Sequence, residues 1–136
     1  MTRLFLDTNI VIDLLDKRAP FYKDAVRLFT MAYYKQVELI VAPITYTTAS
    51  YLLRHHGAEG VRNLLANFRQ LSRVATTDER IIDDSIASQF ADFEDAVQYY
   101  TALKAQADVI ITRNVADFSS AKLPVMTAEE YIATIK

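Results

Sequence analysis

Short apolar runs alternate with amphipathic segments along this chain. The runs Leu4–Leu6 and Asp108–Thr112 lack the polar alternation of a half-exposed strand, so we interpret both as central parallel strands covered on two faces. Shorter runs predict further strands at Leu39–Ala42, Arg73–Ala75 and Lys122–Met126. The pattern therefore predicts a mostly parallel sheet of about 4–5 strands.

Helical periodicity occupies the stretches between these strands. The clearest helix is Ala58–Leu71, in which apolar residues recur at helical spacing while Arg62 and Arg69 face outward. Further helices are predicted over Ile10–Leu15 with Thr8 and Asn9 at its cap, from Pro20 to Ala32, over Thr45–Leu53 with Gly57 closing it, from Thr77, from Asp92, and from Thr127. This alternation indicates βαβ units, and hence a three-layer α/β/α fold in which residues 1–136 form one domain.

Composition narrows the class of protein. A hydrophobic content of 51% is enough to build the core of one domain, and a formal net charge of −2 does not by itself indicate a nucleic-acid or membrane-surface protein. The chain has no cysteine, which excludes disulfides and thiolate chemistry and fits a reducing cytoplasm. No apolar stretch approaches the roughly 20 residues of a membrane span, so we expect a soluble cytoplasmic protein with no membrane contact.

Carboxylates occur where a doubly wound sheet would gather them. Asp7 ends the first strand, Glu94 and Asp95 lie at the start of a helix, and Asp117 follows the strand that ends at Thr112. Ligands of open α/β sheets bind at the carboxyl ends of the strands, and converging carboxylates repel one another unless a cation neutralises them. Oxygen ligands without cysteine favour Mg²⁺ or Mn²⁺, ions that support hydrolysis of phosphodiesters.

These acids also have structural interpretations. Asp7 alone is equally well explained as a helix cap, and Asp92 is better explained as an N-cap than as a ligand. Asp95 lies one helical turn from Tyr99, which favours a side chain leaning toward the sheet edge. We expect the remaining helical acids on solvated faces: Asp13, Asp16, Asp83 and Asp84.

Three motifs together resemble the PIN domains, many of whose bacterial members are VapC-like ribonuclease toxins of type II toxin–antitoxin systems. The motifs are Leu6-Asp7-Thr8-Asn9, Asp92-Phe93-Glu94-Asp95-Ala96 with Ala102, and Ile110-Ile111-Thr112-Arg113-Asn114 with Asp117-Phe118. Their order and spacing match the family along essentially the whole chain. The resemblance implies a metal-dependent ribonuclease that leaves a 5′-phosphate, with a small antitoxin and a second copy of itself as partners.

The resemblance also implies a role for each matching residue. The metal ligands and catalytic residues would be Asp7, Asp95 and Asp117, with Glu94 and Asn114 assisting as ligands, and Thr8, Asn9 and Thr112 would orient these carboxylates. Two positions depart from the family pattern. Thr48 stands where most active members carry a Glu, and Asn114 stands where many carry an Asp, so we expect weaker metal affinity unless Glu94 compensates.

Charge is distributed unevenly along the chain. Between Arg54 and Arg73 there are four Arg and one Glu, whereas between Asp78 and Asp95 there are seven acids and one Arg. A basic segment beside an acidic metal site suits an RNA substrate, because phosphate contacts supply most nonspecific affinity. The candidate RNA-binding residues are Arg54, Arg62, Arg69 and Arg113. We interpret His55 and His56 as cations at a helix end, a favourable position, rather than as metal ligands.

Two other functions stay open at this point. A PIN-fold module that has lost catalysis and binds RNA or protein would explain Thr48 and Asn114, and it would bind RNA without metal-dependent cleavage. A phosphatase of another doubly wound fold would use Asp7 as its nucleophile, but Asn9 stands where such enzymes commonly carry a second Asp. Trapping of an aspartyl-phosphate would identify this last class.

Overall fold

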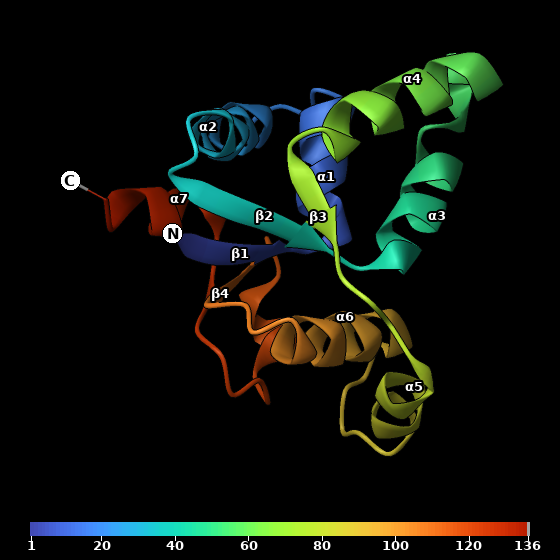
Figure 1. Ribbon diagram of the computed structural model, residues 1–136, viewed down its shortest axis with the longest axis vertical. Helices are drawn as coiled ribbons and strands as arrows, with labels where there is room; N and C mark the ends of the chain where they lie inside the picture. Colours follow the sequence, from blue (N-terminus) through green and yellow to red (C-terminus); the bar gives the residue numbers. More distant parts are fainter. Residues whose placement is uncertain (136) are drawn as a thin grey trace.

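The centre of the computed structural model, which describes residues 1–135, is a parallel five-stranded sheet (Figure 1). Its strands are β1 (Thr2–Leu6), β2 (Val37–Val41), β3 (Ser72–Val74), β4 (Val109–Ile111) and β5 (Val125–Met126). They lie in the order β3-β2-β1-β4-β5, and every neighbouring pair is parallel. The predicted parallel sheet with β1 and β4 at its centre is therefore confirmed.

Helices connect these strands and cover the sheet. They are α1 (Thr8–Leu15), α2 (Tyr22–Tyr33), α3 (Pro43–Leu52), α4 (Gly57–Arg69), α5 (Glu79–Ile86), α6 (Phe93–Lys104) and α7 (Ala128–Ala133). Two short 3-10 helices, η1 (Arg54–His56) and η2 (Val115–Phe118), complete the described elements. The predicted helices are all present, whereas neither 3-10 helix was predicted.

Alternate side chains of β1 pack on opposite faces of the sheet, because successive side chains of a strand point to opposite sides. Leu4 and Leu6 join a core with residues of α1, α2, α4 and α7, and Phe5 joins a second core with residues of α6. Figure 1 shows α1 and α2 on one side of the sheet and α6 on the other. The architecture is thus the three-layer α/β/α arrangement that the strand pattern predicted.

Side-chain caps determine where the site-bearing helix begins. The Asp92 carboxylate accepts a hydrogen bond from the backbone N–H of Asp95 at 3.0 Å and so caps α6, as predicted. Such a cap stabilises a helix by about 1 kcal/mol. Because α6 begins at Phe93, Glu94 and Asp95 both fall in its first turn, at the edge of the sheet.

Several local predictions were wrong. Asp7, not Thr8 or Asn9, is the N-cap residue of α1, and Gly57 begins α4 with φ +79° instead of closing α3. Asp13 is fully buried: its Oδ2 lies 2.9 Å from Nε of Arg113.

Asp16 also departs from the expected solvated position. Its Oδ1 is hydrogen-bonded to the ring nitrogens of both His55 and His56. These histidines were predicted to act as cations at the end of their own helix, whereas each also contacts a carboxylate at the end of α1.

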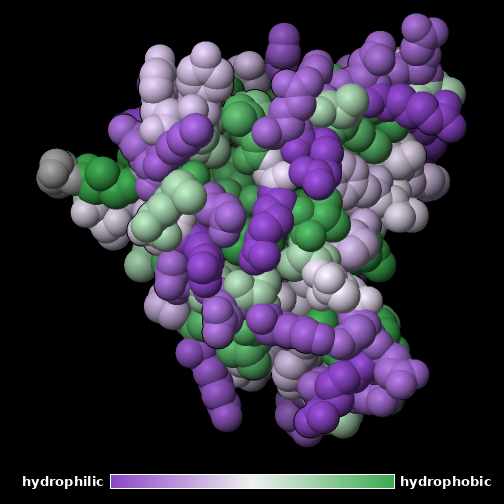
Figure 2. All heavy atoms as spheres, in the orientation of Figure 1, coloured by the Kyte–Doolittle hydropathy of each residue, from purple (hydrophilic) through white to green (hydrophobic). Residues whose placement is uncertain are grey.

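Hydrophilic residues cover much of the surface over two of the helices. Figure 2 shows hydrophilic side chains over the outer sides of α4 and α5, with hydrophobic atoms visible between them. Among residues 1–135, no helix combines the length and apolar character needed to cross a bilayer.

Candidate active site

The candidate site lies where the strand order reverses. From β1 the chain proceeds to β2 on one side and later returns to β4 on the other, so a crevice is expected outside the carboxyl ends of β1 and β4. Asp7 follows β1 and Thr112 follows β4 at this point. Both residues are buried, at 5% and 0% exposure.

Two neighbouring side chains hold the Asp7 carboxylate in position. Gln98 Nε2 on α6 donates to Oδ1 at 3.0 Å, and Thr112 Oγ1 donates to Oδ2 at 2.7 Å. Although Asp7 is the N-cap residue of α1 by position, its side chain makes no cap hydrogen bond. The capping interpretation of this carboxylate is therefore excluded, and its orientation is set by α6 and β4.

Asp95 lies among other carboxylates. Its pKa is raised to about 7, first by burial and then by the negative charges of Asp7, Asp92, Asp117 and Glu94. A carboxyl group that loses its proton only near neutrality marks a place where negative charge is costly. Such perturbed groups cluster at functional sites, which makes this edge of the sheet the leading candidate.

Glu94 reaches toward α3 from the first turn of α6. Its Oε2 accepts a hydrogen bond from Thr8 Oγ1 at 3.0 Å, and its Oε1 accepts one from Thr48 Oγ1 at 3.4 Å. Thr8 also shares a hydroxyl–hydroxyl contact of 3.1 Å with Thr45 of α3. The Glu94 carboxylate is thereby held beside Thr48 of α3.

The segment after β4 supplies the remaining predicted residues. Thr112 Oγ1 accepts a hydrogen bond from the backbone N–H of Asn114 at 3.0 Å while it donates to Asp7. Asn114 then precedes η2, which carries Asp117, and both side chains are exposed. One buried hydroxyl thus connects the Asp7 carboxylate to the loop that bears Asn114 and Asp117.

Gln98 is a site residue that the sequence analysis missed. It is 1% exposed, and besides donating to Asp7 its Oε1 accepts from the backbone N–H of Thr8 at 3.1 Å. A polar side chain one turn beyond Glu94 and Asp95, among the buried residues of α6, was the signal that could have identified it.

The predicted carboxylates of Asp7, Glu94, Asp95 and Asp117 lie close enough to affect the pKa of Asp95 but do not form a tight cluster. Within residues 1–135, no three of the carboxylates of Asp7, Glu94, Asp95 and Asp117 bring oxygens within 4.8 Å of one another. Asn9, on the first turn of α1, is half-buried at the same end of the helix.

The four predicted RNA-binding arginines do not form one patch. Arg54 and Arg62 line the same surface cavity of about 390 Å³ beside α4, whereas Arg69 donates to the backbone carbonyl of Ser72 at 2.8 Å. Arg113 pairs with Asp13 and stacks over the ring of Phe21, 4.1 Å from its centroid.

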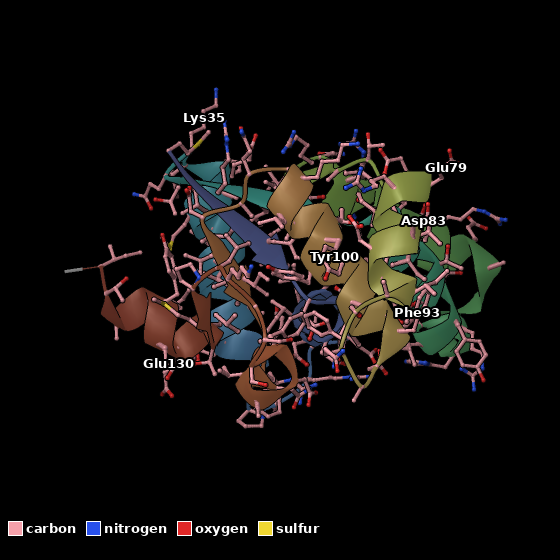
Figure 3. The ribbon with its side chains drawn as sticks, turned by 90° about the horizontal axis from the view of Figure 1, so that it is seen from below. Lys35, Glu79, Asp83, Phe93, Tyr100 and Glu130 are labelled. Atoms are coloured by element: carbon pink, nitrogen blue, oxygen red, sulfur yellow. The ribbon has the colours of Figure 1, made fainter. Side chains whose placement is uncertain are left out.

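Acidic residues lie on α5 and on the first turn of α6, on the opposite side of the sheet from α4 (Figure 1). Figure 3 shows α6 and α5 side by side, with Phe93 at the end of α6 that also bears Glu94 and Asp95. Glu79 and Asp83 lie on α5 in the same view. The acidic charge near the site therefore extends from α6 onto α5, away from Arg54 and Arg62.

Fold and site together define a doubly wound α/β protein with a carboxylate site at its switch point. The chain belongs to the PIN domain family, whose family model matches residues 3–116.

Known relatives agree with this family. The chain is similar to Ribonuclease VapC1 of Aquifex aeolicus (strain VF5), with 22% identity over 134 residues, covering 95% of this chain and 92% of that protein. Its fold is similar to that of VapBC2 from Rickettsia felis bound to a promoter DNA fragment, with a TM-score of 0.69, 15% identity and coverage of 92% and 97% of the two chains. A toxin–antitoxin complex from Klebsiella pneumoniae gives a TM-score of 0.67, 20% identity and the same coverage.

Proposed function

We propose that this protein is a divalent-metal-dependent ribonuclease and the toxin of a type II toxin–antitoxin pair. The observation that carries the proposal is the gathering of carboxylates from β1, α6 and η2 around Asp95, whose pKa is raised to about 7 first by burial and then by these neighbouring charges. The similarity to Ribonuclease VapC1 of Aquifex aeolicus supports RNA as the substrate.

The residues present fit Mg²⁺ or Mn²⁺. Asp7, Asp95 and Asp117 would hold the ion, with Glu94 and Asn114 assisting, and all five offer oxygen donors of the kind that hard divalent cations prefer. A cation would also offset the negative charges that, after burial, raise the pKa of Asp95. When bound, the ion would lower the pKa of a nearby water and stabilise negative charge at phosphorus.

Hydrogen bonds within the chain orient the carboxylates of the proposed site, and burial limits the access of water to Asp7. Gln98 and Thr112 keep both oxygens of Asp7 fixed, and burial keeps that carboxylate from rotating into solvent. Thr8 and Thr48 hold Glu94 in the same way. In the proposed reaction a water oxygen bonds to phosphorus, the bond to the ribose 3′ oxygen breaks, and the products carry a 5′-phosphate and a 3′-hydroxyl.

The first experiment is cleavage of a mixed-sequence fluorescent RNA with Mn²⁺ or Mg²⁺. Wild type is compared with Asp7→Asn and Asp95→Asn proteins purified identically, so that a contaminating nuclease affects all three equally. We expect each substitution to reduce cleavage by at least about 100-fold, since loss of a direct ligand exceeds the effect of losing an outer partner. Equal activity of all three folded proteins would overturn the catalytic proposal.

The proposed partners are a small antitoxin and a second copy of this chain. The Klebsiella pneumoniae protein of similar fold is part of a toxin–antitoxin complex, which supports the first partner. Exposed apolar side chains, including Tyr51 at 63% and Phe93 at 52%, provide surface that a partner would cover. Light scattering of the purified protein tests the second copy, and co-expression with a candidate antitoxin followed by co-purification tests the first partner.

A catalytically weakened binding module is the second candidate. Thr48 in place of the usual Glu favours it, because the site has one acid fewer on α3. This candidate predicts RNA binding with no metal-dependent cleavage, which the same RNA detects by a mobility shift.

A further inference from the structure

Both histidines of this protein converge on one carboxylate. His55 and His56 are the two histidines of the sequence, and their Nε2 atoms lie 3.0 and 2.8 Å from Oδ1 of Asp16. Among residues 1–135, these three side chains form the one group whose ligand atoms all lie within 4.8 Å of one another. Two segments about 40 residues apart in the chain thus direct three possible ligands to the same point.

This donor set differs chemically from the carboxylates near Asp7. Two imidazole nitrogens and one carboxylate oxygen suit Zn²⁺ and related transition ions, whereas Mg²⁺ prefers oxygen alone. The side chains of His55, His56 and Asp16 are 57%, 37% and 19% exposed, so an ion bound by them keeps access to water. Three protein ligands with one open position is a common zinc arrangement.

The charges at the cluster favour a cation. The two imidazole rings lie 4.3 Å apart between centroids, so two protonated rings there would repel each other. Arg18 approaches Asp16 through the other oxygen, with Nε 3.9 Å from Oδ2, which leaves Oδ1 to the histidines.

We propose that Asp16, His55 and His56 form a binding site for Zn²⁺, separate from the carboxylate site. Asp7 and Asp16 flank the two ends of α1, and the eight residues of this helix separate them by about 13 Å. The ion would tie the carboxyl end of α1 to η1, directly after α3. It would therefore stabilise the packing of the two helices that bear Thr8 and Thr48.

Zinc titration of tag-free, metal-stripped protein tests this site. Because no other histidine or cysteine exists in the chain, imidazole resonances in ¹H–¹⁵N NMR report on this cluster alone. We expect 1:1 Zn²⁺ binding by calorimetry, shifts of both histidine signals, and a melting temperature that rises with Zn²⁺ concentration.

Matched variants assign the ion to one site. Asp16→Asn and His56→Gln should weaken Zn²⁺ binding by more than the roughly 10–100-fold typical of losing an outer partner, while Asp7→Asn retains it. Circular dichroism without metal confirms that the variants fold, as expected for exposed His56 and half-buried Asp16. If Asp7→Asn abolishes binding and the cluster variants do not, the ion belongs to the carboxylates and the proposal is wrong. Histidine signals that respond to pH but not to Zn²⁺ would equally reject it.

Discussion

Thr48 Oγ1 donates a hydrogen bond to Oε1 of Glu94 at 3.4 Å, which joins α3 to the first turn of α6. Thr48, the α3 residue at which the family resemblance leads us to expect an acid, is thus next to an acid supplied by another helix. Neighbouring helix residues diverge by about 100°, so sequence alone did not establish that Glu94 and Asp95 serve one region. The contact with Thr48 and the effect of Glu94 on the pKa of Asp95 indicate that they do.

Exchanging the acid between these two helices tests this relationship. Glu94→Gln should weaken Mn²⁺ affinity and RNA cleavage by about 10–100-fold. The double variant Thr48→Glu/Glu94→Gln should recover most of the loss, because the carboxylate then comes from α3. Calorimetric Mn²⁺ titration and initial cleavage rates measure the two effects.

The single variant Thr48→Glu provides the control for that exchange. It places a second carboxylate beside Glu94, so its melting temperature should fall without metal and recover with Mn²⁺. A double variant no better than Glu94→Gln would show that Glu94 acts only in folding or in positioning Thr8.

We expect the hydroxyl of Thr112 to contribute more to stability and to RNA cleavage than the volume of the side chain does. Thr112→Val keeps the shape but leaves Oδ2 of buried Asp7 without its donor, at a cost of about 1–3 kcal/mol in the free energy of unfolding. Thr112→Ser keeps the hydroxyl and should stay close to wild type in both stability and cleavage. Urea denaturation and RNA cleavage of the two variants side by side distinguish loss of the hydrogen bond from loss of packing.

The parts of the fold that were predictable from sequence rest on local patterns. Apolar runs such as Leu4–Leu6, bounded by polar residues, indicate buried strands, and the carboxyl ends of parallel strands share one edge, so Asp7 could be assigned to that edge. Asp92 could be assigned as a cap because capping depends on residues three positions apart.

Contacts between distant segments were not predictable in this way. Gln98 donates a hydrogen bond to Asp7, which lies 91 positions earlier in the sequence. That contact depends on which side of α6 faces the sheet when its small residues pack there. Asp13 meets Arg113 only because α1 and the end of β4 pack together. Periodicity assigns a residue to a helix face but does not say which polar partner the opposing element supplies.

Arg113 illustrates the consequence for function. It was predicted to bind RNA, yet its Nε lies 2.9 Å from Oδ2 of Asp13, which is 0% exposed. These atoms are not aligned as a hydrogen bond, so the contact is an ion pair. Burial raises the pKa of Asp13 and the Arg113 charge opposes that rise.

Removing the guanidinium should therefore destabilise the protein. Arg113→Gln should cost about 3 kcal/mol, the low end for a buried pair because Arg113 is partly exposed, and Asp13→Asn/Arg113→Gln should recover part of it. Chemical denaturation measures both. If Arg113→Gln instead leaves stability unchanged and reduces the salt dependence of RNA affinity, Arg113 is a phosphate contact.

The pKa of Asp95 leads to a pH dependence of stability in the metal-free protein. Between the ordinary carboxyl pKa of 3.8 and about 7, the folded protein retains a proton on Asp95 that the unfolded chain has already released. The folded state then binds more protons than the unfolded state, so the free energy of unfolding falls as pH rises through this range. Above it, the folded protein carries an ionised Asp95 among like charges, and the whole loss is present.

Asp95→Asn resembles the protonated carboxyl and should lack this component. Urea denaturation in EDTA, from about pH 5 to about pH 8, should therefore show a steeper decline for wild type than for Asp95→Asn. Adding Mn²⁺ above pH 7 should restore wild type more than the variant, because the cation stabilises the ionised carboxylates. Parallel pH profiles for the two proteins in EDTA would mean that Asp95 titrates like an exposed carboxyl group, and the electrostatic basis of the proposed metal site would then fail.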